Sequence, residues 1–216
     1  MKIENYIFDF DGTLINSQKD VFLSFQKAFE KVDYPIDKTR LNPDIIGPPL
    51  REIIKLIAPE LTDDKFIDKI CSIFREIYDN DPNDNTFMYN GVFDYLTKLK
   101  ENKKRIFMAT FKPMTPTLML VKKMGIEKFF DDIYGIDKFE KNITKDEMIK
   151  NIIDKYKLNK QETVMIGDAA TDMIAAHKAG INGIGVLWGY GQDKTPLTKN
   201  ADYVIKNIYE LDEIKI

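Results

Sequence analysis

The sequence predicts an α/β fold: a parallel β-sheet core with helices on both faces, interrupted by an all-helical insertion. Two patterns predict it. Short β-branched and aromatic runs alternate with amphipathic helical segments over the second half of the chain, which is typical of parallel strands joined by crossover helices. Between about residues 20 and 87 only helical spacing occurs. We therefore predict a core made of residues 1–15 and 88–216 and a helical domain made of residues 16–87.

The core elements follow one another in a regular order. The first strand ends in an aromatic and β-branched run, residues 6–10, with the polar Asp9 close to its end. The later strands are predicted at residues 105–109, 132–134, 163–166, 183–187 and 203–205, and the helices at residues 92–100, 117–124, 145–156 and around Ala175 and Ala176. This alternation indicates a Rossmann-like sheet.

The insertion carries apolar stripes at helical spacing. One stripe runs through Val21, Phe25 and Phe29, and a second runs from Phe66 to Ile77. Between them, the run 47–49, Gly-Pro-Pro, marks a turn before a short helix. These stripes predict a small helical bundle with its own apolar core.

Composition excludes several classes of protein. The chain has 216 residues, a formal net charge of −3, one His and one Cys. Zinc sites and histidine-dependent triads therefore lack ligands and bases, and the scattered Lys and Arg residues argue against nucleic acid as a partner. The first residues contain no long apolar run, so we expect a cytoplasmic protein with no membrane partner. The self-contained core predicts a monomer or a weak dimer.

Carboxylates follow two of the predicted strands, at the edge where parallel sheets bind ligands. Asp9 and Asp11 end the first strand, and Gly12 allows the backbone to turn closely around a ligand. Asp168 and Asp172 follow the strand at residues 163–166. Four acids repel one another unless a cation lies among them, and oxygen ligands suit Mg²⁺. The sequence therefore predicts a magnesium site.

Two more polar residues fit the binding of a phosphate group. Thr110 ends the strand at residues 105–109, and Lys145 begins a helix that Thr144 is expected to cap together with Glu147. Lys141 is the alternative to Lys145. Each residue alone is as common in turns, caps and surfaces as in sites, but their shared place at strand ends favours a site. Together they supply a nucleophile, charge neutralisation and a proton donor, as phosphoryl transfer requires.

These motifs resemble those of the haloacid dehalogenase superfamily, in particular its phosphoglycolate phosphatase-like subgroup with a helical cap. The resemblance spans nearly the whole chain and rests on four segments: Phe8-Asp9-Phe10-Asp11-Gly12-Thr13-Leu14, Thr110, Lys145 and Gly167-Asp168-x-x-x-Asp172. It implies a catalytic core with residues 16–87 as a cap domain. It also implies Mg²⁺-dependent hydrolysis of a small phosphorylated metabolite.

The resemblance implies a role for each motif residue. Asp9 is expected to attack phosphorus and form an aspartyl phosphate, and Asp11 to protonate the leaving alcohol. Thr110 and Lys145 are expected to bind phosphoryl oxygens. The expected metal ligands are Asp9, the main-chain carbonyl of Phe10, Asp11, Asp168 and Asp172. The remaining expected substrate contacts are Gly12, Thr13 and Phe111, with Gly47 and Pro48 in the cap.

Other functions fit the same fold. A β-phosphoglucomutase-like phosphosugar mutase also resembles this chain, but such mutases generally carry a cap histidine and the insertion has none. Phosphonate hydrolysis needs a cap lysine that forms a Schiff base, and the lysines of the insertion leave it open. A non-catalytic binding protein has no need of both Asp9 and Asp11. Among phosphatase substrates, phosphoglycolate, nucleotides, sugar phosphates and pyrophosphate all remain candidates.

Overall fold

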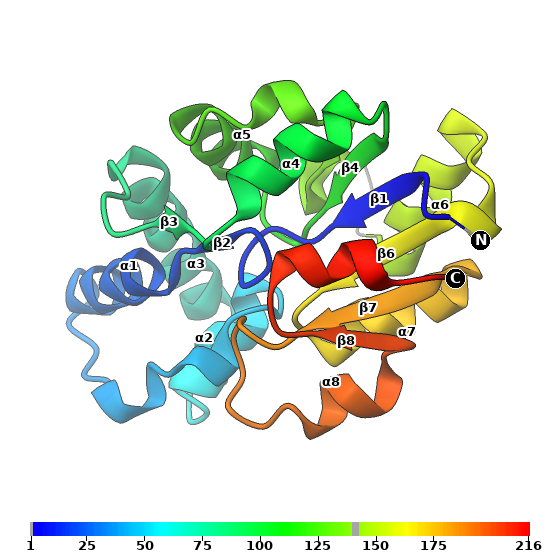
Figure 1. Cartoon of the computed structure of the whole chain (residues 1–216). Coiled ribbons are helices and arrows are strands. Elements are labelled where there is room, and N and C mark those ends of the chain that lie inside the picture. The colour runs from blue at the N-terminus through cyan, green and yellow to red at the C-terminus, as the bar shows by residue number, and fades with distance from the viewer. Residues whose placement is uncertain (1, 140–142) are drawn as a thin grey trace. The chain divides into compact units, whose positions relative to one another are not determined.

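The computed structural model describes residues 2–139 and 143–216 and has the predicted α/β architecture (Figure 1). A six-stranded sheet has the order β5-β4-β1-β6-β7-β8, and each neighbouring pair is parallel. Its strands are β1 (Asn5–Phe8), β4 (Arg105–Ala109), β5 (Asp132–Tyr134), β6 (Thr163–Gly167), β7 (Asn182–Val186) and β8 (Tyr203–Ile205). A second sheet pairs two short strands, β2 (Ile15–Asn16) and β3 (Phe87–Met88).

The core helices lie close to the predicted ranges. They are α4 (Val92–Glu101), α5 (Met114–Lys123), α6 (Lys145–Tyr156), α7 (Ala170–Ala179) and α8 (Thr195–Asn200). Helix α5 begins three residues before the predicted start, and α8 and the short β2–β3 pair were not predicted. None of the helices in the described part of the chain has the length and hydropathy of a transmembrane span.

Alternate residues of the central strands enter two different apolar clusters, so both faces of the sheet are covered. In β1, Tyr6 and Phe8 pack into the cluster that contains α4 and α5, whereas Ile7 packs into the cluster that contains α6 and α7. The same alternation holds in β4 and β6. Strands buried on both faces read as continuous apolar runs, which explains why these segments were recognisable from sequence.

Contacts divide the chain into two compact units, residues 1–16 with 88–216 and residues 17–87. The second unit contains α1 (Gln18–Glu30), α2 (Leu50–Ile57) and α3 (Asp64–Asn80) around an apolar cluster of its own. Cys71 is buried in that cluster. We call residues 17–87 the helical unit and the remainder the core unit.

Within each unit, hydrogen bonds join the segment that leads into the insertion to the segment that leads out of it. In the core unit, the backbone N–H of Tyr89 donates to the Leu14 carbonyl at 3.1 Å. In the helical unit, the buried carboxylate of Asp20 accepts hydrogen bonds from the Asn85 side-chain amide and the Thr86 hydroxyl, both at 2.7 Å. The segments that lead into and out of the insertion are therefore fixed at both sides of the junction.

Candidate active site

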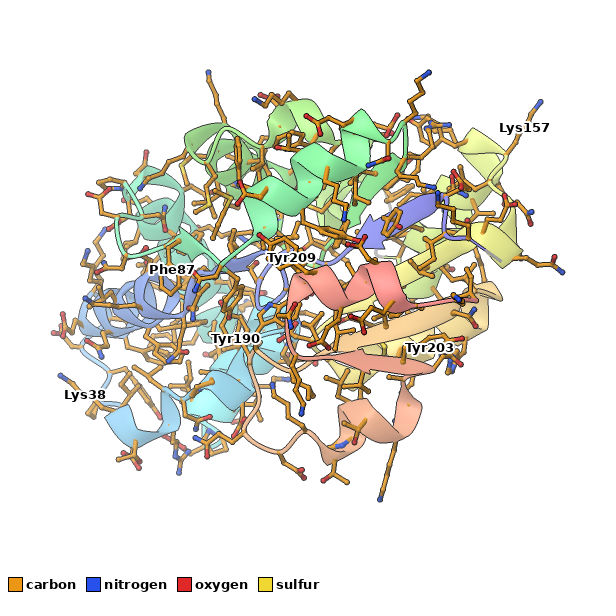
Figure 2. All side chains as sticks on the ribbon, viewed as in Figure 1. Lys38, Phe87, Lys157, Tyr190, Tyr203 and Tyr209 are labelled. Atoms are coloured by element: carbon orange, nitrogen blue, oxygen red, sulfur yellow. The ribbon has the colours of Figure 1, made fainter. Side chains whose placement is uncertain are left out.

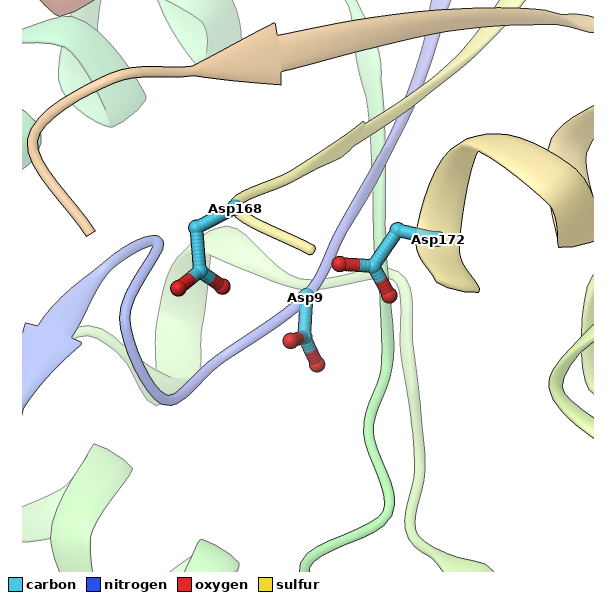
Figure 3. Close-up of side chains that lie close together, drawn as sticks. All are labelled: Asp9, Asp168 and Asp172. Atoms are coloured by element: carbon cyan, nitrogen blue, oxygen red, sulfur yellow. The ribbon is translucent and has the colours of Figure 1, made fainter. Parts of the chain in front are cut away.

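Three buried aspartates meet at the carboxyl ends of β1 and β6 (Figure 3). The parallel register sets Phe8 beside Ile166, and the Asp9 N–H donates to the Ile166 carbonyl at 2.8 Å. The residues that directly follow β1 and β6, Asp9 and Asp168, are thereby brought together, and Asp172 joins them from the first turn of α7. One carboxylate oxygen from each of the three lies within 4.8 Å of the others.

Glycines allow the backbone to approach Asp168 closely. Gly12 has φ +82°, and a Cβ there would lie 2.2 Å from Oδ2 of Asp168. A Cβ on Gly189, in the loop after β7, would lie 2.2 Å from the Asp168 Cβ and 2.3 Å from the Gly12 carbonyl oxygen. Two backbone segments therefore enclose the Asp168 side chain, and they can approach it this closely only because glycine stands at positions 12 and 189.

Among the described residues, Lys145 brings a positive charge into direct contact with this cluster. Its buried Nζ lies 3.0 Å from Oδ1 of Asp9 and 2.5 Å from Oδ1 of Asp172. The residue opens α6, where the Glu147 carboxylate accepts from the backbone N–H of Thr144 at 2.7 Å, as the predicted capping pair requires. The alternative lysine, Lys141, lies outside the described residues.

Burial makes the negative charge of these acids costly. Burial, the largest cause, raises the pKa of Asp9 to about 7 despite the attraction of Lys145. Burial and then repulsion from Asp172 and Asp9 raise the pKa of Asp168 well above its usual range. Burial alone would lower the pKa of Lys145, but the Asp172 and Asp9 carboxylates hold it above its usual range. One ammonium group thus compensates only part of the negative charge.

The donor set fits a hard divalent cation. Asp9, Asp168 and Asp172 offer only carboxylate oxygens, at mutual distances that one ion can span, and their charge is incompletely neutralised. Mg²⁺ binds through a few carboxylates and keeps waters and phosphate oxygens as its other ligands. The acidic cluster could therefore hold the predicted metal.

The structure argues against one predicted metal ligand, the Phe10 carbonyl. This oxygen accepts hydrogen bonds from the backbone N–H groups of Leu14 at 2.9 Å and Ile15 at 3.1 Å. The Phe10 carbonyl oxygen therefore points into the turn after β1, where these two N–H groups bind it. The Asp11 carboxylate is likewise not part of the three-residue cluster, and it pairs with Lys112.

The other predicted site residues of the core unit lie around the cluster. Thr110 is buried at the end of β4, and its backbone N–H donates to Tyr134 at 2.9 Å. The Thr13 hydroxyl donates to Oδ1 of Asp168 at 3.4 Å. The Phe111 ring centroid lies 5.1 Å from Nζ of Lys145, a distance suited to a cation–π contact. The structure therefore gives Thr13 and Phe111 contacts with other site residues.

Gly47 and Pro48 belong to the helical unit, in the turn between the short 3₁₀ helix Pro43–Ile45 and α2. Gly47 is exposed and has φ +127°, a conformation that favours glycine. Their contact with substrate stays a prediction.

A loop after β7 also supports the site, and its individual contacts were not predicted. The backbone N–H of Tyr190, labelled in Figure 2, donates to Oδ2 of Asp168 at 2.8 Å. The Trp188 indole donates to the Thr13 carbonyl at 3.0 Å, and Lys194 donates to the Gly189 carbonyl at 3.0 Å. Nothing in the sequence indicated that a main-chain N–H would orient Asp168.

Sequence reasoning also missed Lys112. Its Nζ lies 3.2 Å and 3.1 Å from the two carboxylate oxygens of Asp11, and its side chain is 8% exposed. The available signal was its position two residues after Thr110, at the same edge of the sheet.

A doubly covered parallel sheet with a carboxylate cluster and a buried lysine at its carboxyl edge defines an α/β enzyme. Comparison with known proteins gives the family. The family model described as haloacid dehalogenase-like hydrolase matches residues 6–186, and the chain belongs to that family.

Relatives and solved structures extend this similarity over nearly the full chain. Pyrophosphatase PpaX of Halalkalibacterium halodurans is 26% identical over 99% of this chain and 97% of its own. Phosphoglycolate phosphatase of Vibrio parahaemolyticus is 25% identical over 96% of this chain and 93% of its own. The structure of a haloacid dehalogenase-like hydrolase from Streptococcus pneumoniae is 26% identical, with a TM-score of 0.85 over 97% of this chain and 96% of that one.

Proposed function

We propose that this protein is a Mg²⁺-dependent phosphatase that hydrolyses a small phosphomonoester through a phosphorylated Asp9. The observation that carries the proposal is the buried Asp9 carboxylate, 3.0 Å from Lys145 and within an acidic cluster. The names of two relatives, a pyrophosphatase and a phosphoglycolate phosphatase, support small phosphorylated substrates. Its substrate is a small phosphorylated metabolite.

In the first step, a carboxylate oxygen of Asp9 attacks phosphorus and the bond from phosphorus to the leaving oxygen breaks. Asp11 donates a proton to that oxygen, so the leaving group departs as a neutral alcohol. Lys145 lies within reach of the phosphoryl oxygens, because it contacts the nucleophile itself. The Thr110 hydroxyl, which accepts from the Lys112 N–H at 3.1 Å, donates its own proton to another phosphoryl oxygen.

In the second step, a water molecule attacks the phosphorus of the aspartyl phosphate and the bond to Asp9 breaks. Asp11, deprotonated by the first step, accepts a proton from this water, so inorganic phosphate leaves and both aspartates return to their starting states. The same carboxyl group serves as acid and then as base.

Asp9, Asp168 and Asp172 are the residues that would hold Mg²⁺. When bound, the ion supplies positive charge that offsets the repulsion between these acids and the phosphate. Thr13 and the Tyr190 N–H keep Asp168 oriented toward the cluster.

The test is phosphate release from a panel of small phosphomonoesters and pyrophosphate, with Mg²⁺ or with EDTA. We expect Mg²⁺-dependent release that Asp9→Asn abolishes, because the amide cannot act as the nucleophile. Asp154→Asn, an exposed acid on α6, is the matched control and should retain full activity. Retained activity in Asp9→Asn, or interconversion of sugar phosphates without phosphate release, contradicts the proposal.

A further inference from the structure

Lys112 makes a contact that the proposed chemistry does not yet use. Its Nζ lies almost equally far, 3.2 Å and 3.1 Å, from the two oxygens of the Asp11 carboxylate. Both side chains are largely buried, with 8% of Lys112 and 16% of Asp11 exposed. An ammonium group centred between two carboxylate oxygens fixes the direction in which the carboxylate points, since either rotation lengthens one contact.

The backbone of Lys112 is held in place by its neighbours. Its N–H donates to the Thr110 hydroxyl at 3.1 Å, and its carbonyl accepts from the Ile136 N–H at 3.4 Å. A Cβ on Gly135 would lie 2.7 Å from that carbonyl, so the segment after β5 packs closely against it. The lysine therefore extends from a fixed turn at the end of β4.

The strand order brings Lys112 to Asp11. Strands β1 and β4 are parallel neighbours with Phe8 beside Met108. The residues that follow them run along the same edge of the sheet, and residues 11 and 112 stand at corresponding distances past the strand ends. The topology of the sheet thus places the two residues within reach of each other, and the direction of the lysine side chain completes the contact.

We propose that Lys112 is a positioning residue for Asp11: it holds the Asp11 carboxyl group in the orientation needed to transfer a proton to the leaving oxygen. This inference rests on the proposed phosphatase activity. Lys145 cannot take over this task, because its Nζ is engaged by Asp9 and Asp172. The two lysines thus serve different acids, Lys145 the nucleophile and Lys112 the proton donor.

The test compares Lys112→Met and Lys112→Arg on two substrates by kcat/KM, which reports the steps up to departure of the leaving group. For an alkyl phosphomonoester, which needs a proton on its leaving oxygen, we expect Lys112→Met to lower kcat/KM by about 10- to 100-fold. For p-nitrophenyl phosphate, whose phenolate leaves without a proton, the fall should be under about 3-fold. Arginine, which can also bridge both oxygens, should restore part of the alkyl activity.

A double-mutant cycle with Asp11→Asn separates positioning from substrate binding. If Lys112 acts through Asp11, adding Lys112→Met to Asp11→Asn should lower kcat/KM for the alkyl substrate no further. Equal losses on both substrates, a full additional loss in the double variant, or unchanged kcat/KM in Lys112→Met overturns the inference. Lys112→Gln replaces Lys112→Met if circular dichroism shows that the methionine variant does not fold.

The failure of this inference is distinct from the failure of the proposed function. An unsubstituted protein that releases no phosphate contradicts the phosphatase proposal. An active protein whose activity is independent of residue 112 contradicts only the role of Lys112.

Discussion

Asp9 and Asp168 lie in surroundings that penalise their own charge. Burial raises the pKa of both carboxyl groups, and Lys145 offsets this only in part. A cluster of this kind lowers the stability of the protein without its ion, because the repulsion between the acids is present in the folded state and absent in the unfolded chain. The same repulsion becomes a source of affinity when a cation binds.

Replacing Asp168 by Asn should therefore stabilise the metal-free protein. In EDTA we expect Asp168→Asn to have a higher Tm than the unsubstituted protein, by about 2–4 °C for each kcal/mol of repulsion relieved. The asparagine carbonyl can still accept from the Tyr190 N–H. Adding Mg²⁺ should raise the Tm of the unsubstituted protein and leave that of Asp168→Asn almost unchanged. Differential scanning fluorimetry measures both.

Asp154→Asn is the control for this prediction, because Asp154 is exposed on α6 and its charge is solvated. It should leave both the Tm in EDTA and the Mg²⁺ response unchanged. A lower Tm for Asp168→Asn together with a full Mg²⁺ response would show that Asp168 serves the fold and not the ion.

The sequence predicted that Asp9, Asp11, Asp168 and Asp172 would gather at one edge of the sheet. Three of them meet in one cluster, whereas Asp11 pairs with Lys112. Asp9 and Asp168 come directly after the buried strands β1 and β6, and neighbouring parallel strands end at the same edge. The contact of Lys112 with Asp11 joins residues that are 101 positions apart, and a lysine side chain can bend toward solvent or toward the site. Its direction depends on packing that no single sequence displays.

At the scale of elements, Asp132 connects strand β5 to the segments that follow it. Its side chain is 17% exposed and accepts hydrogen bonds from Lys138 at 2.5 Å, Lys155 at 2.8 Å and Tyr156 at 2.9 Å. Burial alone would raise the pKa of Asp132, but these three donors hold it well below its usual range. The carboxylate thus fixes the short helix Ile136–Lys138 and the end of α6 to β5.

Asp132→Asn should destabilise the protein at neutral pH and progressively less in acid. A carboxyl group with a lowered pKa in the folded state stabilises the fold above about pH 4, and this contribution is lost as the pH falls further. We expect a loss of roughly 1–2 kcal/mol at pH 7, discounted for the exposure of Lys155. Urea unfolding at pH 7 and pH 3 should show a difference between the two proteins that is smaller at pH 3 than at pH 7, because the lowered pKa keeps part of the stabilisation at pH 3.

The sequence predicted the bounds of helices and strands correctly where the burial of an element produces a clear hydrophobic pattern. The strands of the central sheet alternate between two apolar clusters, so their apolar runs are unbroken and easily recognised. Helix α8 has only six residues and begins next to Pro196, so too few positions show helical spacing. Strands β2 and β3 have two residues each, too few to show the alternation of apolar and polar residues that marks a strand.

At the scale of the whole molecule, two compact units with separate apolar cores share one chain. The helical unit depends on Asp20, which holds the segment that enters the unit to the segment that leaves it through Asn85 and Thr86. Because these contacts lie inside the helical unit, their loss should weaken that unit and leave the central sheet intact.

Asp20→Ala should lower protection from hydrogen exchange in residues 17–87 only. The substitution leaves the Thr86 hydroxyl and the Asn85 amide without their acceptor, at a cost of about 1–3 kcal/mol. Amides of β1 and β6 should exchange as slowly as before, which mass spectrometry of proteolytic peptides can measure. Equal loss of protection in both units would show that they unfold as one.

The hydrogen bond between Tyr89 and Leu14 has a consequence for how such a chain diverges. Since these backbone atoms lie 3.1 Å apart, the core closes at this point as it would around a hairpin turn. The entropy of closing a loop grows only with the logarithm of its length, so a longer insertion between these two residues adds little to the cost of closing the core. Over generations the insertion can be lengthened, trimmed or exchanged while the aspartates of the core unit keep their register.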